Sequence, residues 1–175
     1  MKIVPTTRDM LPRLAECFRA AYAPQGEIWS SEKALEFITF KFNRWPDLSF
    51  AAVRNGEPVG AIFTDMKPWH DGPHLCEGEL FVHPKHQGNP FIAIPLALAL
   101  INTAKRKYNC SAIEGVTFKK GNQLSMYEKI GYKEDPTLTF ITGNIDVMLE
   151  KLAPYQKRFG KIGIYGRANQ EEIKK

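Results

Sequence analysis

The chain has 175 residues, of which 43% are hydrophobic and 25% are charged, and its formal net charge is +5. This length is most simply one domain with a core of its own, and the composition is ordinary for a soluble globular protein. The positive charge, with a pI of about 9.1, favours anionic partners such as a phosphorylated cofactor or nucleic acid, although many proteins without such partners share it.

Three cysteines, Cys17, Cys76 and Cys110, stand far apart and form no CxxC pair. Their odd number and wide spacing argue against a disulfide scaffold and a structural zinc site, so we expect no metal and a reducing, cytoplasmic location. The N-terminal residues enter a strand-like run with no secretory h-region, and the longest apolar run, over 90–101, is too short to span a bilayer. No association with a membrane is therefore expected.

The N-terminal part of the chain predicts a strand and two helices. Lys2 to Val4 is strand-like, and Thr-Thr-Arg-Asp at 6–9 resembles a capping box before a run of apolar residues at helical spacing that ends at 23–26. A second helix is predicted over 30–43. One face of this helix carries Ala34, Phe37, Ile38 and Lys41.

A hairpin and a further strand follow. The runs over 48–53 and 59–63 flank Arg-Asn-Gly-Glu at 54–57, and Asn-Gly between two apolar runs is the strongest short-range signal for a hairpin. A polar, aromatic loop over 67–75 then leads into a strand over 77–82.

The remainder of the chain alternates helices and strands. The predicted elements are a helix ending at 105–107, a strand over 112–116, a helix over 123–130, a strand over 137–141 and a helix over 145–155. This order, with one central βαβ unit, predicts an α/β (mixed α+β) fold in which helices flank a mixed, mostly antiparallel twisted sheet. We expect one domain over 1–145, followed by a C-terminal helix and basic tail over 146–175.

Two stretches carry a resemblance to a known family. Residues 79–88, Glu-Leu-Phe-Val-His-Pro-Lys-His-Gln-Gly, run from a strand into a loop, and residues 122–132 contain an Asn followed by Tyr-Glu-Lys-Ile-Gly-Tyr. In this order, and on this pattern of strands and helices, they resemble the GNAT superfamily of N-acetyltransferases, which have the acyl-CoA N-acyltransferase fold. The likeness spans residues 1–145.

The loop departs from the family's pattern, Gln/Arg-x-x-Gly-x-Gly/Ala, in which glycines let backbone N–H groups approach phosphate oxygens closely. Pro90 and Ile92 stand at the two later glycine positions. Proline has no N–H, so one donor is lost, while Asn89 as N-cap and Pro90 as first residue are well suited to begin a helix. Asn122 also precedes Tyr127 by fewer residues than is usual in the family.

The resemblance implies acetyl-CoA (coenzyme A) as the co-substrate. The backbone of Phe81 and Val82 would hold the acyl carbonyl and the pantetheine arm. Backbone N–H groups of the loop would bind the pyrophosphate. These N–H groups belong to Gln87, Gly88, Asn89 and Phe91. Asn122 would be a further cofactor contact.

The resemblance also assigns catalytic roles. Tyr127 would be the general acid that protonates the leaving thiolate, and Glu77 or Glu79 would be the general base, directly or through water. Period-two alternation places both glutamates on the same face of their strand. The alternative interpretations are a core position for Tyr127 and solvated charges for the two glutamates.

The leading hypothesis is an N-acyltransferase that moves an acetyl group from acetyl-CoA to a primary amine of a small molecule or a protein. Direct transfer is favoured because no cysteine falls within the motifs. The alternative is a GNAT-like binding module without catalysis, whose degenerate loop has lost the cofactor and whose basic tail contacts nucleic acid or another acidic partner. A bulkier acyl donor is a third hypothesis, and a homodimer through the helix over 145–155 is compatible with each.

Overall fold

The computed structural model describes residues 1–115 together with residues 128, 133 and 147. The chain forms two compact units, Met1–Lys119 and Lys120–Lys175. The predicted boundary between residues 145 and 146 falls outside the described residues and stays a prediction. The predicted elements over 123–130, 137–141 and 145–155 also lie outside them.

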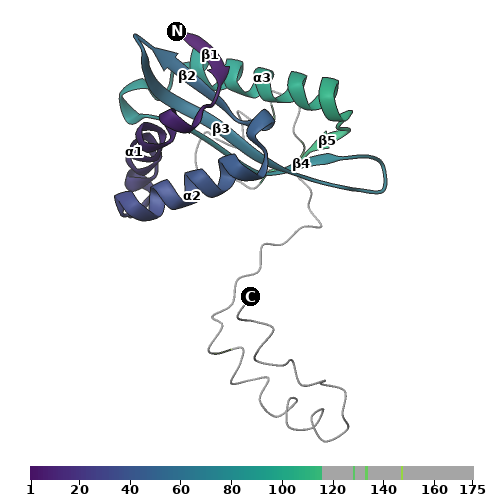
Figure 1. Ribbon diagram of the computed structural model, residues 1–175, viewed down its shortest axis with the longest axis horizontal. Helices are drawn as coiled ribbons and strands as arrows, with labels where there is room; N and C mark the ends of the chain where they lie inside the picture. Colours follow the sequence, from purple (N-terminus) through teal and green to yellow (C-terminus); the bar gives the residue numbers. More distant parts are fainter. Residues whose placement is uncertain (116–127, 129–132, 134–146, 148–175) are drawn as a thin grey trace, which may run out of the picture. The chain divides into compact units, whose positions relative to one another are not determined.

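Five strands form one sheet in the order β1-β2-β3-β4-β5 (Figure 1). Their bounds are Lys2–Pro5 for β1, Phe50–Arg54 for β2, Glu57–Lys67 for β3, His74–Val82 for β4 and Ala112–Ile113 for β5. The first four strands pair antiparallel, and β5 pairs parallel to β4. The predicted mixed, mostly antiparallel sheet flanked by helices is confirmed.

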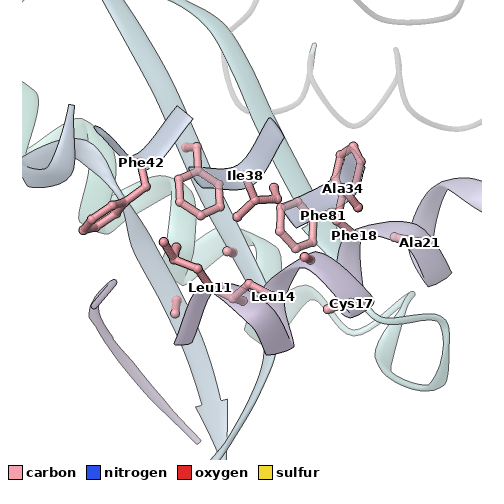
Figure 2. Packing of buried hydrophobic residues seen from close by; sticks show 13 residues of the cluster. Leu11, Leu14, Cys17, Phe18, Ala21, Ala34, Ile38, Phe42 and Phe81 are labelled. Atoms are coloured by element: carbon pink, nitrogen blue, oxygen red, sulfur yellow. The ribbon is translucent and has the colours of Figure 1, made fainter. Parts of the chain in front are cut away.

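Helices cover both faces of this sheet (Figure 1). On one face α1 (Leu11–Tyr22) and α2 (Ser31–Arg44) bury an apolar cluster against the sheet residues Ala61, Phe63 and Phe81, and Figure 2 shows this packing. On the other face α3 (Pro90–Tyr108) buries Ile92, Leu96, Leu100 and Ala104 in a second cluster. The apolar residues of α3 recur at helical spacing, so one side of the helix enters the core.

The predicted hairpin turn and the predicted second helix are confirmed. Asn55 and Gly56 have φ values of 52° and 83°, which is the left-handed geometry that a tight two-residue hairpin turn requires. The side chain of Ser30 accepts a hydrogen bond from the Lys33 N–H at 3.1 Å and caps α2.

The predicted capping box at 6–9 is wrong. Thr6 is buried, and its N–H donates to the Ser49 carbonyl at 2.9 Å, which ties the end of β1 to the approach to β2. Thr7 makes no capping hydrogen bond with its side chain, and a short 3-10 helix over Arg8–Met10 leads into α1. The tertiary contact therefore overrides the local capping signal.

The predicted loop over 67–75 is shorter than expected, because β3 reaches Lys67 and β4 begins at His74. Lys67 pairs with His74 and Met66 with Leu75, so these residues extend the ladder. Among the helices that the structure describes, none is long and apolar enough to cross a membrane.

Candidate functional site

The central feature of the site is a bulge in β4. Glu77 has a φ of 50°, and the pairing of β3 with β4 shifts between Phe63↔Glu79 and Asp65↔Cys76. A bulge places an extra residue in one strand and thereby changes which backbone groups face each neighbour.

The hydrogen bonds on either side of the bulge show this change. Before it, the carbonyls of Pro73 and Leu75 accept from Ser111 at 3.0 Å and Glu114 at 2.8 Å, on the β5 side. After it, the His83 N–H donates to Val59 of β3 at 2.9 Å. Because alternate residues of an antiparallel strand bond the same neighbour, the peptide groups of Phe81 also point toward β3.

The peptide groups of Leu80 and Val82 therefore point to the opposite edge of β4. Within the described residues, β5 pairs with β4 only at His74 and Leu75, so this edge carries no strand beside Leu80 and Val82. The Val82 carbonyl accepts from Gln87 Nε2 at 3.0 Å. As far as residues 1–115 show, the second half of β4 thus presents an open edge of backbone donors and acceptors.

This register separates two residues that the sequence analysis grouped. Val82 lies on the open edge, as its predicted role requires, whereas the backbone of Phe81 faces β3 and its ring is buried against Phe18 at 5.4 Å. Leu80 takes the place on the edge that was assigned to Phe81. Period-two alternation was the available signal, because adjacent residues of a strand cannot both direct their peptide groups to one edge.

The loop after β4 ends at the N-terminus of α3. Gly88 has a φ of 78°, which favours glycine, and the side chain of Asn89 caps the helix by accepting from the Phe91 N–H at 3.0 Å. The Gln87 N–H donates to the Pro84 carbonyl at 3.3 Å. Of the four predicted phosphate donors, only the N–H groups of Gly88 and Asn89 lack an acceptor among the described residues.

Glu79 lies in β4 just after the bulge, where the last residue of α1 reaches it. Its carboxylate accepts a hydrogen bond from the Tyr22 hydroxyl at 2.9 Å. Burial raises the pKa of Glu79, while the Tyr22 hydrogen bond and the Lys41 charge oppose this rise. A carboxyl group with a raised pKa is suited to accept a proton near neutral pH.

Glu77, the other predicted base, has a different environment. Its side chain is 73% exposed, and its carboxylate lies 3.8 Å from the Lys41 ammonium of α2. Both glutamates contact the α1–α2 layer, but Glu77 does so from the bulge, where the strand alternation is interrupted. Of the two, Glu79 has the enclosed position.

An aromatic cluster backs the Tyr22–Glu79 pair. The Phe18 ring lies 4.6 Å from Tyr22, 5.2 Å from Trp29 and 5.3 Å from Phe37, measured between ring centroids. Trp29 and Phe37 also line a shallow depression of about 300 Å³ on the outer side of α2. Aromatic rings therefore pack behind the Tyr22–Glu79 pair, in keeping with the burial that raises the pKa of Glu79.

The three cysteines are free thiols. Burial raises the pKa of Cys17 to about 12, and burial also raises the pKa values of Cys76 and Cys110. The thiolate is the nucleophilic form of cysteine, so none of the three is activated at neutral pH.

Two predicted site residues, Tyr127 and Asn122, lie outside the described residues, and their roles stay predictions. Sequence reasoning missed Tyr22 and Lys41 as neighbours of the two glutamates. A signal existed for Lys41, since a lysine on the apolar face of a helix needs a buried partner. Within residues 1–115 and the three single described positions, no group of side chains could hold a metal ion.

The sequence matches the acetyltransferase (GNAT) family over residues 11–132, and the chain belongs to this family. No match was found among curated proteins.

Solved structures with the same fold include a probable acetyltransferase, with a TM-score of 0.66, 19% identity and coverage of 82% of this chain and 97% of the other. A transcriptional regulator from Bacillus halodurans C-125 matches with a TM-score of 0.64 and 17% identity over 82% and 98% of the two chains. A predicted acetyltransferase with acetyl-CoA, from Clostridium acetobutylicum, matches with a TM-score of 0.63 and 16% identity over 81% and 95%. At these identities, the likeness shows the fold alone.

Proposed function

We propose that the chain is an N-acetyltransferase that transfers an acetyl group from acetyl-CoA directly to a primary amine, in a reducing, cytoplasmic setting. Membership of the acetyltransferase family supports the reaction class. The single observation that carries the proposal is the open edge of β4, which places backbone donors between a helix N-terminus on one side and the half-buried Glu79 on the other.

The described residues fit the co-substrate at both ends. The free N–H groups of Gly88 and Asn89, at the positive end of the α3 dipole, suit a pyrophosphate. The N–H groups of Leu80 and Val82 on the open edge suit the amide and thioester oxygens of an extended acyl-pantetheine arm, much as a strand edge binds a peptide. When bound, acetyl-CoA supplies an activated acyl group.

The chain's own residues supply the remaining chemistry. Glu79 accepts the proton of the attacking amine, directly or through a water molecule, while the Tyr22 hydroxyl keeps its carboxylate oriented. The Leu80 N–H is the donor for the carbonyl oxygen that gains charge during attack. Tyr127 returns a proton to the leaving thiolate in this proposal. Direct transfer is favoured over an acyl-cysteine because all three thiols have raised pKa values.

Calorimetric titration with acetyl-CoA tests the proposal. We expect saturable binding that raises the thermal midpoint and weakens when Gln87→Ala removes the side chain that contacts the Val82 carbonyl. A Cys76→Ser variant should keep the wild-type transfer rate. If acetyl-CoA does not bind at millimolar concentration, the acetyltransferase proposal fails.

A second candidate is the binding module without catalysis. The observation that favours it is the reduced set of donors in the loop, because Pro90 has no N–H and the Phe91 N–H is engaged by Asn89. In that case the basic C-terminal tail would contact nucleic acid or another acidic partner. Binding of a nucleic acid in the absence of any coenzyme A binding would support this second function.

A further inference from the structure

A lysine side chain lies in the core between α2 and the sheet. Lys41 is 4% exposed, and its ammonium lies 3.1 Å from Oδ2 of Asp65, which is 2% exposed. Arg44, one turn further along α2, reaches the other carboxylate oxygen of Asp65 at 2.7 Å. Burying such charges is costly unless each is paired, so the arrangement has to be held by specific partners.

The second partner of Lys41 is the bulge itself. The ammonium donates a hydrogen bond of 2.8 Å to the backbone carbonyl of Glu77, the residue with a φ of 50°. A residue with a Cβ is disfavoured in this left-handed conformation and keeps it only where the surroundings fix it. The preceding carbonyl, that of Cys76, accepts from the Thr64 hydroxyl at 3.0 Å. Two side chains thus bond two successive carbonyls at the bulge.

The bulge decides which residues of β4 face the open edge. Before the bulge, Pro73 and Leu75 face β5, and after it, Leu80 and Val82 face the edge. Without the extra residue, the alternation would turn the peptide groups of Phe81 outward instead. The Lys41–Glu77 hydrogen bond therefore acts on the placement of the proposed donors without touching a substrate.

We propose that Lys41 is a positioning residue for acetyl transfer: held by Asp65, it fixes the Glu77 bulge and thereby places the Leu80 and Val82 donors and the Glu79 carboxylate. This inference rests on the proposed function, which supplies the reaction that the positioned groups serve. A buried ion pair that only stabilises the fold is the competing explanation, and it predicts no effect on the reaction below the melting temperature.

The charge of Lys41 also acts on the Glu79 carboxylate. The other groups that act on it are the Tyr22 hydroxyl of α1, the carboxylate of Glu27 between α1 and α2, and the carboxylate of Glu77 in β4. Burial, and to a lesser degree the two neighbouring carboxylates, raise the pKa of Glu79, while the Tyr22 hydrogen bond and the Lys41 charge lower it. Removing the ammonium should move the acidic limb of the rate profile to higher pH, an effect that a purely structural lysine would not have.

The test is Lys41→Met, with Lys33→Met on the same helix as the matched control. Methionine retains an unbranched side chain, one atom shorter than that of lysine and without the charge, and Asp65 keeps its ion pair with Arg44. Lys33 is 65% exposed and pairs with Glu36, so its removal should leave the site unchanged. Well below the melting temperature, we expect Lys41→Met to lower kcat on the order of 10²-fold, as small misplacements of reacting groups do. The Kd for acetyl-CoA should change less than kcat.

Amide hydrogen exchange separates this inference from the proposed function. In Lys41→Met, but not in Lys33→Met, the amides over 77–82 should exchange faster, whether or not the protein proves to be a transferase. Unchanged exchange together with unchanged kcat and pH profile would overturn the positioning role. Faster exchange in Lys41→Met, combined with a wild-type protein that neither binds acetyl-CoA nor acetylates an amine, would uphold the role of Lys41 at the bulge and overturn the proposed function.

If Lys41→Met does not fold, the same measurements are made on Thr64→Val. This substitution removes only the hydroxyl that bonds the Cys76 carbonyl and nearly conserves the side-chain volume. We expect the same two changes in smaller degree, namely faster exchange over 77–82 and a lower kcat. Wild-type values of both in Thr64→Val would overturn the inference.

Discussion

The Tyr22 hydroxyl, at the last residue of α1, donates a hydrogen bond of 2.9 Å to the Glu79 carboxylate of β4, which lies 57 residues further along the chain. This contact stabilises the charged form of a carboxyl group whose pKa burial raises. The helix layer thus sets both the orientation and the proton affinity of the proposed base.

Tyr22→Phe should raise the pKa of Glu79 further, because the hydrogen bond that favours the carboxylate is lost while the burial remains. The base is active when deprotonated, so the acidic loss of kcat/KM should begin at a higher pH than in the wild type. Tyr108→Phe is the matched control, since that hydroxyl bonds Asp47 at the far end of α3. If the acidic loss of kcat/KM in Tyr22→Phe begins at the same pH as in the wild type, or at a lower pH, the role of Tyr22 is contradicted.

Glu79→Gln and Glu77→Gln should distinguish the two candidate bases. Loss of a general base typically lowers kcat by about 10²–10⁴-fold, and we expect this for Glu79→Gln. Because the Glu77 side chain is largely exposed, its replacement should change kcat by less than about fivefold, the scale of a surface charge interaction. Steady-state rates with one amine acceptor measure the loss of kcat in each variant. A larger loss in Glu77→Gln than in Glu79→Gln would make Glu77 the base.

The sequence predicts most of the described fold because its local signals agree with its tertiary contacts. The Asn-Gly turn and the apolar spacing of α1 each specify their element. The bulge could not be predicted in the same way, because Glu77 carries no left-handed signal of its own. Its conformation depends on Lys41 and Thr64, which are distant in the sequence.

The site is predicted less completely for the same reason. The positions of Val82, Gly88 and Asn89 at the end of β4 and at the start of α3 follow from local signals, and their binding roles stay predictions. Whether Leu80 or Phe81 directs its backbone to the open edge depends on the strand register, and the register depends on the bulge. The Tyr22–Glu79 contact depends on how α1 crosses the sheet, which no spacing in the sequence encodes.

Pro90→Ala should strengthen coenzyme A binding. The substitution restores a backbone N–H at the start of α3, beside the free N–H groups of Gly88 and Asn89. A hydrogen bond to a charged group contributes about 1.5–3 kcal/mol, so titration should show a Kd lower by roughly tenfold or more. Pro95→Ala, inside the same helix, is the control and should stabilise α3 without changing the Kd. Equal affinities of wild type and Pro90→Ala would mean that the first turn of α3 does not contact the phosphates.

The tip of the β3–β4 hairpin holds a histidine between two carboxylates. His74 is buried, its Nδ1 lies 2.7 Å from Glu114 and its Nε2 lies 2.7 Å from Asp71. Since carboxylates only accept hydrogen bonds, both ring nitrogens have to carry a proton, and the imidazolium joins β4 to the residue after β5. The Glu114 hydrogen bond is the main cause that raises the pKa of His74, with Asp71 adding to it against the effect of burial.

His74→Gln should therefore make the stability of the protein less dependent on pH. A group whose pKa is raised on folding contributes stability that is fully present below its ordinary value of about 6.5 and is lost as the pH rises through the raised value. Urea denaturation across this window should show a clear deficit for His74→Gln at the acidic end, and the difference from wild type should shrink at alkaline pH. His70→Gln, in the same loop, should follow the wild-type curve. A deficit that is the same at every pH would mean that His74 contributes packing and not charge.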